Sequence, residues 1–106
     1  MNILFDQGTP LPLRRFLTSH SVQTAFENQW QTLTNGQLIA AAEQAAFELL
    51  ITTDQNLRYQ QNLAGRKIAI LVLMTTSWPR ISKEVSRVTA ELEKLKPGDY
   101  IEIDFS

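Results

Sequence analysis

Short, continuous apolar runs alternate along this chain with longer segments in which apolar residues recur every third or fourth position. Continuous runs are typical of strands that are buried on both faces of a sheet, and the longer spacing is typical of helices that pack against one. An alternation of the two predicts successive βαβ units. We therefore expect a three-layer α/β/α sandwich with a mainly parallel sheet of four or five strands.

The apolar runs and the local start and stop signals set the expected boundaries. The expected strands are 2–5, 22–26, 49–52, 67–73 and a more polar one at 100–103. The expected helices are 10–19, 35–47, 55–63 and 79–96. Thr34 and Gln37 form a capping-box pattern at the start of the second helix. The first helix is expected to bury Leu13, Phe16 and Leu17.

The helix expected at 79–96 has the clearest pattern of all. Its apolar residues fall at spacings of three and four and form one stripe, made of Ile81, Val85, Val88, Leu92 and Leu95. Two interpretations of this stripe stay open. It packs in the core, or it extends into an interface with a second copy of the chain or with a protein partner.

At 106 residues the chain is expected to form a single domain, 1–106. It contains no cysteine, which excludes disulfides, cysteine-ligated zinc and thiol nucleophiles. The longest strongly apolar stretch, 68–74, is too short to cross a bilayer, and the N-terminus does not resemble a signal peptide. We therefore expect a cytoplasmic protein with no membrane partner. The net charge of −1 gives no general attraction to nucleic acid.

Two aspartates each follow an apolar run, and this repeated pattern is the strongest functional signal in the chain. The run at 3–5 leads into Asp6, and the run at 49–53 leads into Asp54. If both runs are parallel strands, both carboxylates emerge at the edge where open α/β sheets bind their ligands. Thr75 follows a strand at the same edge. Two carboxylates can hold Mg²⁺ when water and a phosphate complete its coordination shell.

Each aspartate also has a purely structural interpretation. Asp54 stands where the N-cap of the following helix belongs, and Asp6 can accept hydrogen bonds from amides of the turn before Gly8. The equivalent positions of the two acids favour a shared ligand site over two unrelated caps.

Three segments of the chain resemble a small PIN-like family, the DUF5615 group, which is related to VapC-type toxins and to Mut7-C domains. The segments are 3–8 (ILFDQG), 34–38 (TNGQL) and 50–57 (LITTDQNL). The resemblance covers most of the chain, from residue 2 to residue 81, and the final helix and strand are less diagnostic. It implies a PIN-like fold and a cluster of acids that binds Mg²⁺ or Mn²⁺ and cleaves RNA.

By this resemblance Asp6 matches the first acid of the family and Asp54 matches the acid of its Thr-x-Asp element. The match weakens where relatives tend to carry further acids, because this chain has Asn35, Gln37 and Asn56. Neutral amides are poor Mg²⁺ ligands and cannot deprotonate an attacking water, so a two-metal site lacks ligands. The resemblance also implies a toxin that pairs with a small antitoxin-like protein.

An active site of this kind would carry out Mg²⁺- or Mn²⁺-assisted phosphodiester hydrolysis of RNA. Asp6 and Asp54 would hold one metal, and the neutral amides and Thr75 would be supporting or substrate-orienting groups. Arg58 and Tyr59 could contact a phosphate and stack on a base. An exposed arginine and a half-buried tyrosine on a short helix explain this pair equally well.

Two other functions remain open at this point. The first is a catalytically degenerate PIN-like module that binds nucleic acid or a protein partner, and the neutral residues in place of acids support it. The second is a phosphoreceiver-like signalling domain, which also has acids after strands one and three and a threonine after strand four. Lys96 and Pro97 resemble the receiver Lys-Pro pair, but they end a helix here instead of following a fifth strand.

Overall fold

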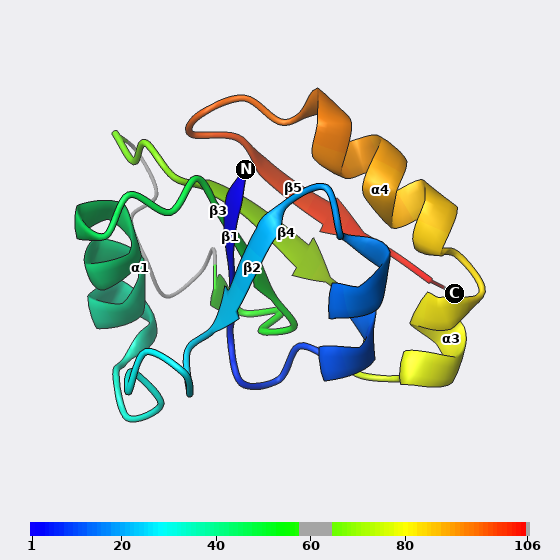
Figure 1. Ribbon diagram of the computed structural model, residues 1–106, viewed down its shortest axis with the longest axis horizontal. Coiled ribbons are helices and arrows are strands. Elements are labelled where there is room, and N and C mark those ends of the chain that lie inside the picture. Colours follow the sequence, from blue (N-terminus) through cyan, green and yellow to red (C-terminus); the bar gives the residue numbers. More distant parts are fainter. Residues whose placement is uncertain (58–64, 106) are drawn as a thin grey trace.

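The computed structural model describes residues 1–57 and 65–105 and contains a five-stranded, entirely parallel sheet with the order β2-β1-β3-β4-β5 (Figure 1). The strands are β1 (Asn2–Phe5), β2 (Ser21–Thr24), β3 (Leu49–Thr52), β4 (Ala69–Leu73) and β5 (Tyr100–Ile103). The described helices are the 3₁₀ helix η1 (Leu11–Phe16) and the α-helices α1 (Asn35–Gln44), α3 (Trp78–Ser82) and α4 (Val85–Lys94). The expected α/β sandwich with a parallel sheet is confirmed.

Both faces of the central strands are buried, as their continuous apolar runs predicted. Every residue of β3 and β4 is buried, and so are the last three residues of β1. Helices η1, α3 and α4 cover one face through Leu13, Ile81, Val88 and Leu92, while α1 covers the other (Figure 1). Full burial of one such aliphatic side chain contributes about 1.5–3 kcal/mol. The sheet core is therefore the main source of stability.

Both ends of α1 are closed by local hydrogen bonds. At the N-terminus, the capping box is confirmed, because the Gln37 amide donates to Thr34 Oγ1 (3.3 Å) and the Thr34 amide donates to Gln37 Oε1 (3.0 Å). At the C-terminus, Ala46 has a φ of 65° and the Phe47 amide donates to the Ala42 carbonyl (2.9 Å), a Schellman motif. The left-handed conformation of Ala46 explains why α1 ends at Gln44 and not at residue 47.

The prediction of a single long helix at 79–96 is wrong, because the chain forms α3 and α4 with a break between them. Glu84 adopts non-helical angles (φ −129°, ψ 30°), and the Ser82 hydroxyl donates back to the Pro79 carbonyl at 2.9 Å. The break itself contains a 3₁₀-type bond, in which the Glu84 amide donates to the Ile81 carbonyl at 2.9 Å. The apolar stripe nevertheless continues across the break and packs against the sheet, so it belongs to the core.

Other boundaries differ by a few residues. The strands expected at 22–26 and 67–73 are 21–24 and 69–73. Phe16, expected to be buried, is 50% exposed and lies against Trp78, with 6.0 Å between the ring centroids. The reason is that η1 ends at Phe16, so the chain turns and inserts Leu17 into the core instead. Most of the helix expected at 55–63 lies outside the described residues.

Because Ala46 is left-handed, glycine substitutions at Ala46 and at Ala40 should change the free energy of unfolding in opposite directions. Ala46→Gly should stabilise the protein by about 0.5–1 kcal/mol, because glycine adopts a positive φ without a Cβ clash. Ala40→Gly, on the exposed face of α1, should destabilise it by about 1 kcal/mol, because glycine weakens a helix interior. Urea unfolding of both variants measures the two changes. Destabilisation of both by similar amounts would contradict the assignment of Ala46 to the Schellman motif.

Candidate functional site

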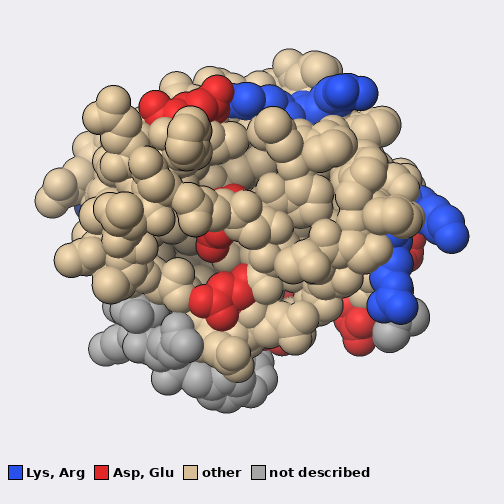
Figure 2. All heavy atoms as spheres, turned by 90° about the horizontal axis from the view of Figure 1, so that it is seen from below, with Lys and Arg blue, Asp and Glu red and all other residues tan. Residues whose placement is uncertain are grey.

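The candidate site lies at the carboxyl edge of the sheet, outside the ends of β1 and β3. The strand order reverses between these two strands, because β2 lies on one side of β1 and β3 on the other. Open α/β sheets bind ligands at such a switch point. Asp6 follows β1 directly and Asp54 follows β3 by two residues, so both acids reach this point. Figure 2 looks onto this edge and shows acidic side chains near its middle, while Lys and Arg side chains lie toward its rim.

A buried hydroxyl links the two acidic segments. Thr52, the last residue of β3, is only 1% exposed. Its Oγ1 donates to Asp6 Oδ2 at 2.5 Å and accepts a hydrogen bond from the Asp54 amide at 3.1 Å. The same oxygen therefore holds the Asp6 carboxylate beside the backbone of Asp54. The sequence predicted no role for Thr52, although a hydroxyl residue at the end of a buried apolar run is a signal that could have indicated one.

The Asp54 carboxylate is oriented by two further donors. Asn35 Nδ2, from the first residue of α1, donates to Asp54 Oδ2 at 2.6 Å. The Asn56 amide donates to Asp54 Oδ1 at 3.0 Å, so Asp54 closes the turn that follows β3. Asp54 therefore closes a turn with its own side chain and also contacts Asn35 at the site edge, while the helix it was expected to cap lies mostly outside the described residues.

The Asp6 carboxylate is held by its own turn. The Gly8 amide donates to Asp6 Oδ1 at 3.0 Å, and the Thr9 hydroxyl donates to the Ile51 carbonyl at 2.8 Å. A Cβ at Gly8 would lie 2.3 Å from Thr53 Oγ1, so a larger residue there would require the Thr53 side chain to shift. The turn and the end of β3 are therefore packed together around the acid.

The remaining predicted residues are spread more widely. The Gln37 side chain is occupied in the capping box of α1, and Asn56 reaches Asp54 through its backbone and is itself exposed. Thr75 lies past the end of β4, where its hydroxyl accepts a hydrogen bond from the Ser77 amide at 3.1 Å. Arg58 and Tyr59 lie outside the described residues.

Two hollows flank Asp6. One, of about 140 Å³, lies between Asp6 and Asn35 and has Trp30 in its wall. The other, of about 510 Å³, lies on the side of η1 and β2 and is walled partly by Leu11 and Phe26. This larger hollow could not be predicted from the sequence, because the pattern around Leu11 and Phe26 does not distinguish an exposed apolar side chain from a buried one.

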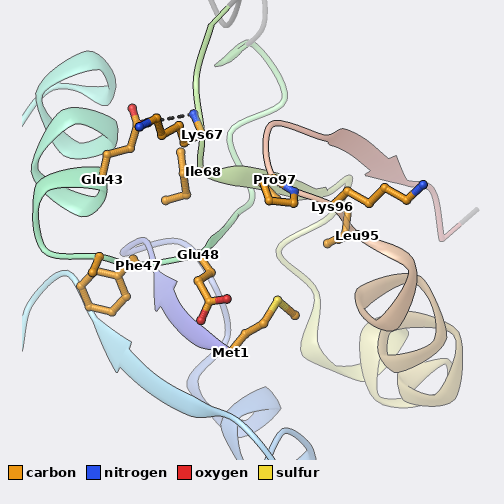
Figure 3. Close-up of a pocket in the computed structure, with 11 residues that line it drawn as sticks. Met1, Glu43, Phe47, Glu48, Lys67, Ile68, Leu95, Lys96 and Pro97 are labelled. Atoms are coloured by element: carbon orange, nitrogen blue, oxygen red, sulfur yellow. Dashed lines mark hydrogen bonds between the residues drawn. The ribbon is translucent and has the colours of Figure 1, made fainter.

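A further hollow of about 510 Å³ lies at the opposite, amino edge of the sheet (Figure 3). Its walls include Met1, Ile68 and Leu95, and the Lys67 amide donates to Glu43 Oε2 at 2.9 Å beside it. Lys96 also lines it. Because the amino ends of the strands lie here, this hollow is separate from the site of the two aspartates.

The chemistry of the donors limits what metal the site can hold. Within residues 1–57 and 65–105, no group of three or more His, Cys, Asp or Glu side chains could hold a metal ion. Asp6 and Asp54 each use both oxygens once in the hydrogen bonds described above. A carboxylate has about four lone-pair sites, so each retains acceptor capacity. Two carboxylates are too few for a pair of metals, whereas Mg²⁺ is commonly bound through one or two carboxylates when waters complete its coordination shell.

Comparison of the chain with protein-family models, curated proteins and solved structures gave no match. Among the described residues, no helix has both the length and the apolar character needed to cross a bilayer. The candidate site is therefore supported by its own geometry.

The bridging hydroxyl of Thr52 generates the second prediction. Thr52→Val keeps the shape of the side chain but removes the donor to Asp6 and the acceptor for the Asp54 amide. We expect a loss of about 1.5–3 kcal/mol in the free energy of unfolding, because one of the two lost bonds is to a charged group. Thr52→Ser keeps the hydroxyl and should retain the backbone chemical shifts of residues 6–8 and 54 in NMR spectra. A larger disturbance of these shifts in Thr52→Ser than in Thr52→Val would show that the methyl group, and not the hydroxyl, organises the site.

Proposed function

We propose that this chain is a PIN-like ribonuclease that uses one Mg²⁺ or Mn²⁺ ion held by Asp6 and Asp54. The observation that carries the proposal is the Thr52 hydroxyl, which joins the two acidic segments at the switch point of the sheet. An isolated cap needs no such link to a second acid. The resemblance of the three segments around Asp6, Asn35 and Asp54 to PIN-like proteins supplies the substrate class.

A bound metal of this kind would polarise a phosphate oxygen and lower the pKa of a coordinated water. The chain's own residues would fix the two carboxylates. Thr52 and the Gly8 amide orient Asp6, while Asn35 and the Asn56 amide orient Asp54. Fixed ligands cost little reorganisation when a substrate arrives.

The supporting residues have narrower roles in this proposal. Asn35 positions Asp54, and Asn56 and Thr75 flank the place where substrate would enter. Gln37 acts indirectly, by fixing the start of the helix that carries Asn35. Arg58 and Tyr59 are proposed to contact RNA on the basis of the sequence alone. The role of a toxin with a small antitoxin-like partner rests on the resemblance alone.

A second candidate is a PIN-like module that binds RNA or a protein partner without cleaving it. The observation that favours it is the contact between Asn35 and Asp54. The Asn35 side-chain amide donates a hydrogen bond to Asp54. An acid at the same position would instead offer a further ligand for a metal ion. The same two carboxylates could bind a metal without activating a water strongly enough for cleavage.

The strand order favours a third candidate, the phosphoreceiver-like domain, because receivers share the order 2-1-3-4-5. The position of the lysine opposes it. Lys96 and Pro97 precede β5 and line the hollow at the amino edge, away from Asp54. Labelling of Asp54 by acetyl phosphate is the result that would favour a receiver over a nuclease.

Metal binding is the first test of the proposed function. Calorimetric titration with Mg²⁺ and with Mn²⁺ should show one site in the wild type. Asp6→Asn and Asp54→Asn should each weaken binding by about tenfold or more, which corresponds to at least about 1.4 kcal/mol. Cleavage of single-stranded RNA should require the metal and should fall in the same two variants.

Glu93→Gln is the matched control, since it also removes one negative charge, from an exposed position on α4. It should leave both metal affinity and cleavage unchanged. Metal binding without cleavage would favour the binding module. Absence of binding at millimolar metal would reject the metal site and leave the two aspartates as turn and cap residues.

A further inference from the structure

The larger hollow beside Asp6 gathers exposed apolar surface. Of the described residues, the large apolar side chains that are exposed are Leu11 (55%), Phe16 (50%) and Phe26 (68%). Leu11 and Phe26 both line this hollow of about 510 Å³. Pockets of this size with apolar walls and a few polar groups are typical of small-ligand sites. Exposed apolar side chains that line the same hollow are therefore typical of a binding site.

The polar part of the hollow is an oriented carboxylate. Arg14 Nη2 donates to Glu27 Oε1 at 2.5 Å and to the Val22 carbonyl at 2.8 Å, and the Thr24 amide donates to Glu27 Oε1 at 2.9 Å. These bonds use one oxygen of Glu27, and its side chain is 48% exposed. The hydrogen bond from Arg14 lowers the pKa of the Glu27 carboxyl, so the group stays ionised at neutral pH.

The charges of the hollow define the kind of ligand it can take. Its lining contains the carboxylates of Asp6 and Glu27 and one guanidinium, that of Arg14, which is already paired. A phosphate placed here would meet net negative charge. A flat, neutral ring that carries N–H donors would stack on Phe26 and donate to Glu27.

We propose that this hollow binds a base of the RNA next to the cleaved phosphate, and that it prefers guanine. The Watson–Crick edge of guanine presents two adjacent N–H donors, from N1 and N2, and both can point at Glu27 Oε2, the oxygen that the bonds from Arg14 and the Thr24 amide do not use. Uracil presents one donor between two carbonyl oxygens, which a carboxylate repels. The ring would stack on Phe26, as unpaired bases do on aromatic side chains.

The position of Asp6 favours RNA over a protein segment as the occupant. Asp6 lines this hollow and is also one of the two proposed metal ligands, so a base in the hollow would lie beside the reacting phosphate. This inference rests on the proposed function for its substrate class. A protein segment would cover Leu11 and Phe26 but would not require two N–H donors opposite Glu27.

Nucleoside binding without metal tests the inference separately from cleavage. NMR titration of the full chain with guanosine, adenosine, cytidine and uridine, in the presence of EDTA, should shift the amides of residues 11, 26 and 27. Guanosine should bind about tenfold more tightly than uridine. Phe26→Ala should weaken guanosine binding about tenfold through loss of stacking. Phe16→Ala is the matched control, because Phe16 is similarly exposed but does not line the hollow.

Glu27→Gln tests the base preference itself, since glutamine keeps the size of the side chain and loses its charge. It should reduce the advantage of guanosine over uridine to about twofold or less. Failure of all four nucleosides to shift these amides would overturn the inference and favour a protein segment as the occupant. Equal effects of Phe26→Ala and Phe16→Ala would overturn it too. Guanosine binding by a chain that neither binds metal nor cleaves RNA would reject the proposed function and leave the guanine site intact.

Discussion

Strands β1 and β3 pair in parallel at the centre of the sheet, with Ile3 opposite Leu49 and Phe5 opposite Ile51. These side chains are fully buried, and each is worth about 1.5–3 kcal/mol to the folded state. A shift of this register by one residue would exchange the two faces of a strand and break both clusters of the core. The same register brings the ends of β1 and β3 level. The proximity of the acids is thus a consequence of apolar packing.

In the described part of the chain, the buried polar side chains lie at the carboxyl end of the β1–β3 pair. Among the described residues, the buried polar side chains are Thr9 and Thr52, and both hydroxyls donate to groups at the carboxyl edge. A buried hydroxyl without a partner costs about 1–3 kcal/mol, so both must keep these bonds. The Asp6 turn is therefore fixed to β3 by the core itself. This explains how a short, exposed segment can hold a carboxylate in one orientation.

The parts of the fold that the sequence predicts well are those governed by one local rule. The run 49–52 is a strand to the residue, and the Thr34–Gln37 capping box starts α1 where expected. The errors arise where a second interaction competes with the pattern. Helix α1 ends early because Ala46 turns left-handed, and 79–96 breaks at Glu84, whose backbone is non-helical and whose amide donates to the Ile81 carbonyl. Strand order, the bridge by Thr52 and the hollow beside Phe26 depend on tertiary contacts, which no local pattern contains.

The neutral amide at position 35 changes the charge balance of the site. A carboxylate there, at the 2.6 Å that separates Asn35 Nδ2 from Asp54 Oδ2, would repel Asp54 unless a cation or a proton lay between them. The amide removes that repulsion by donating a hydrogen bond, so the folded chain needs no cation at this contact. The site gains stability without metal and loses a metal ligand. Under the proposed function, the two oriented carboxylates would bind one hydrated cation that arrives with a phosphate, and the basic side chains toward the rim of the face would lie outside that contact (Figure 2).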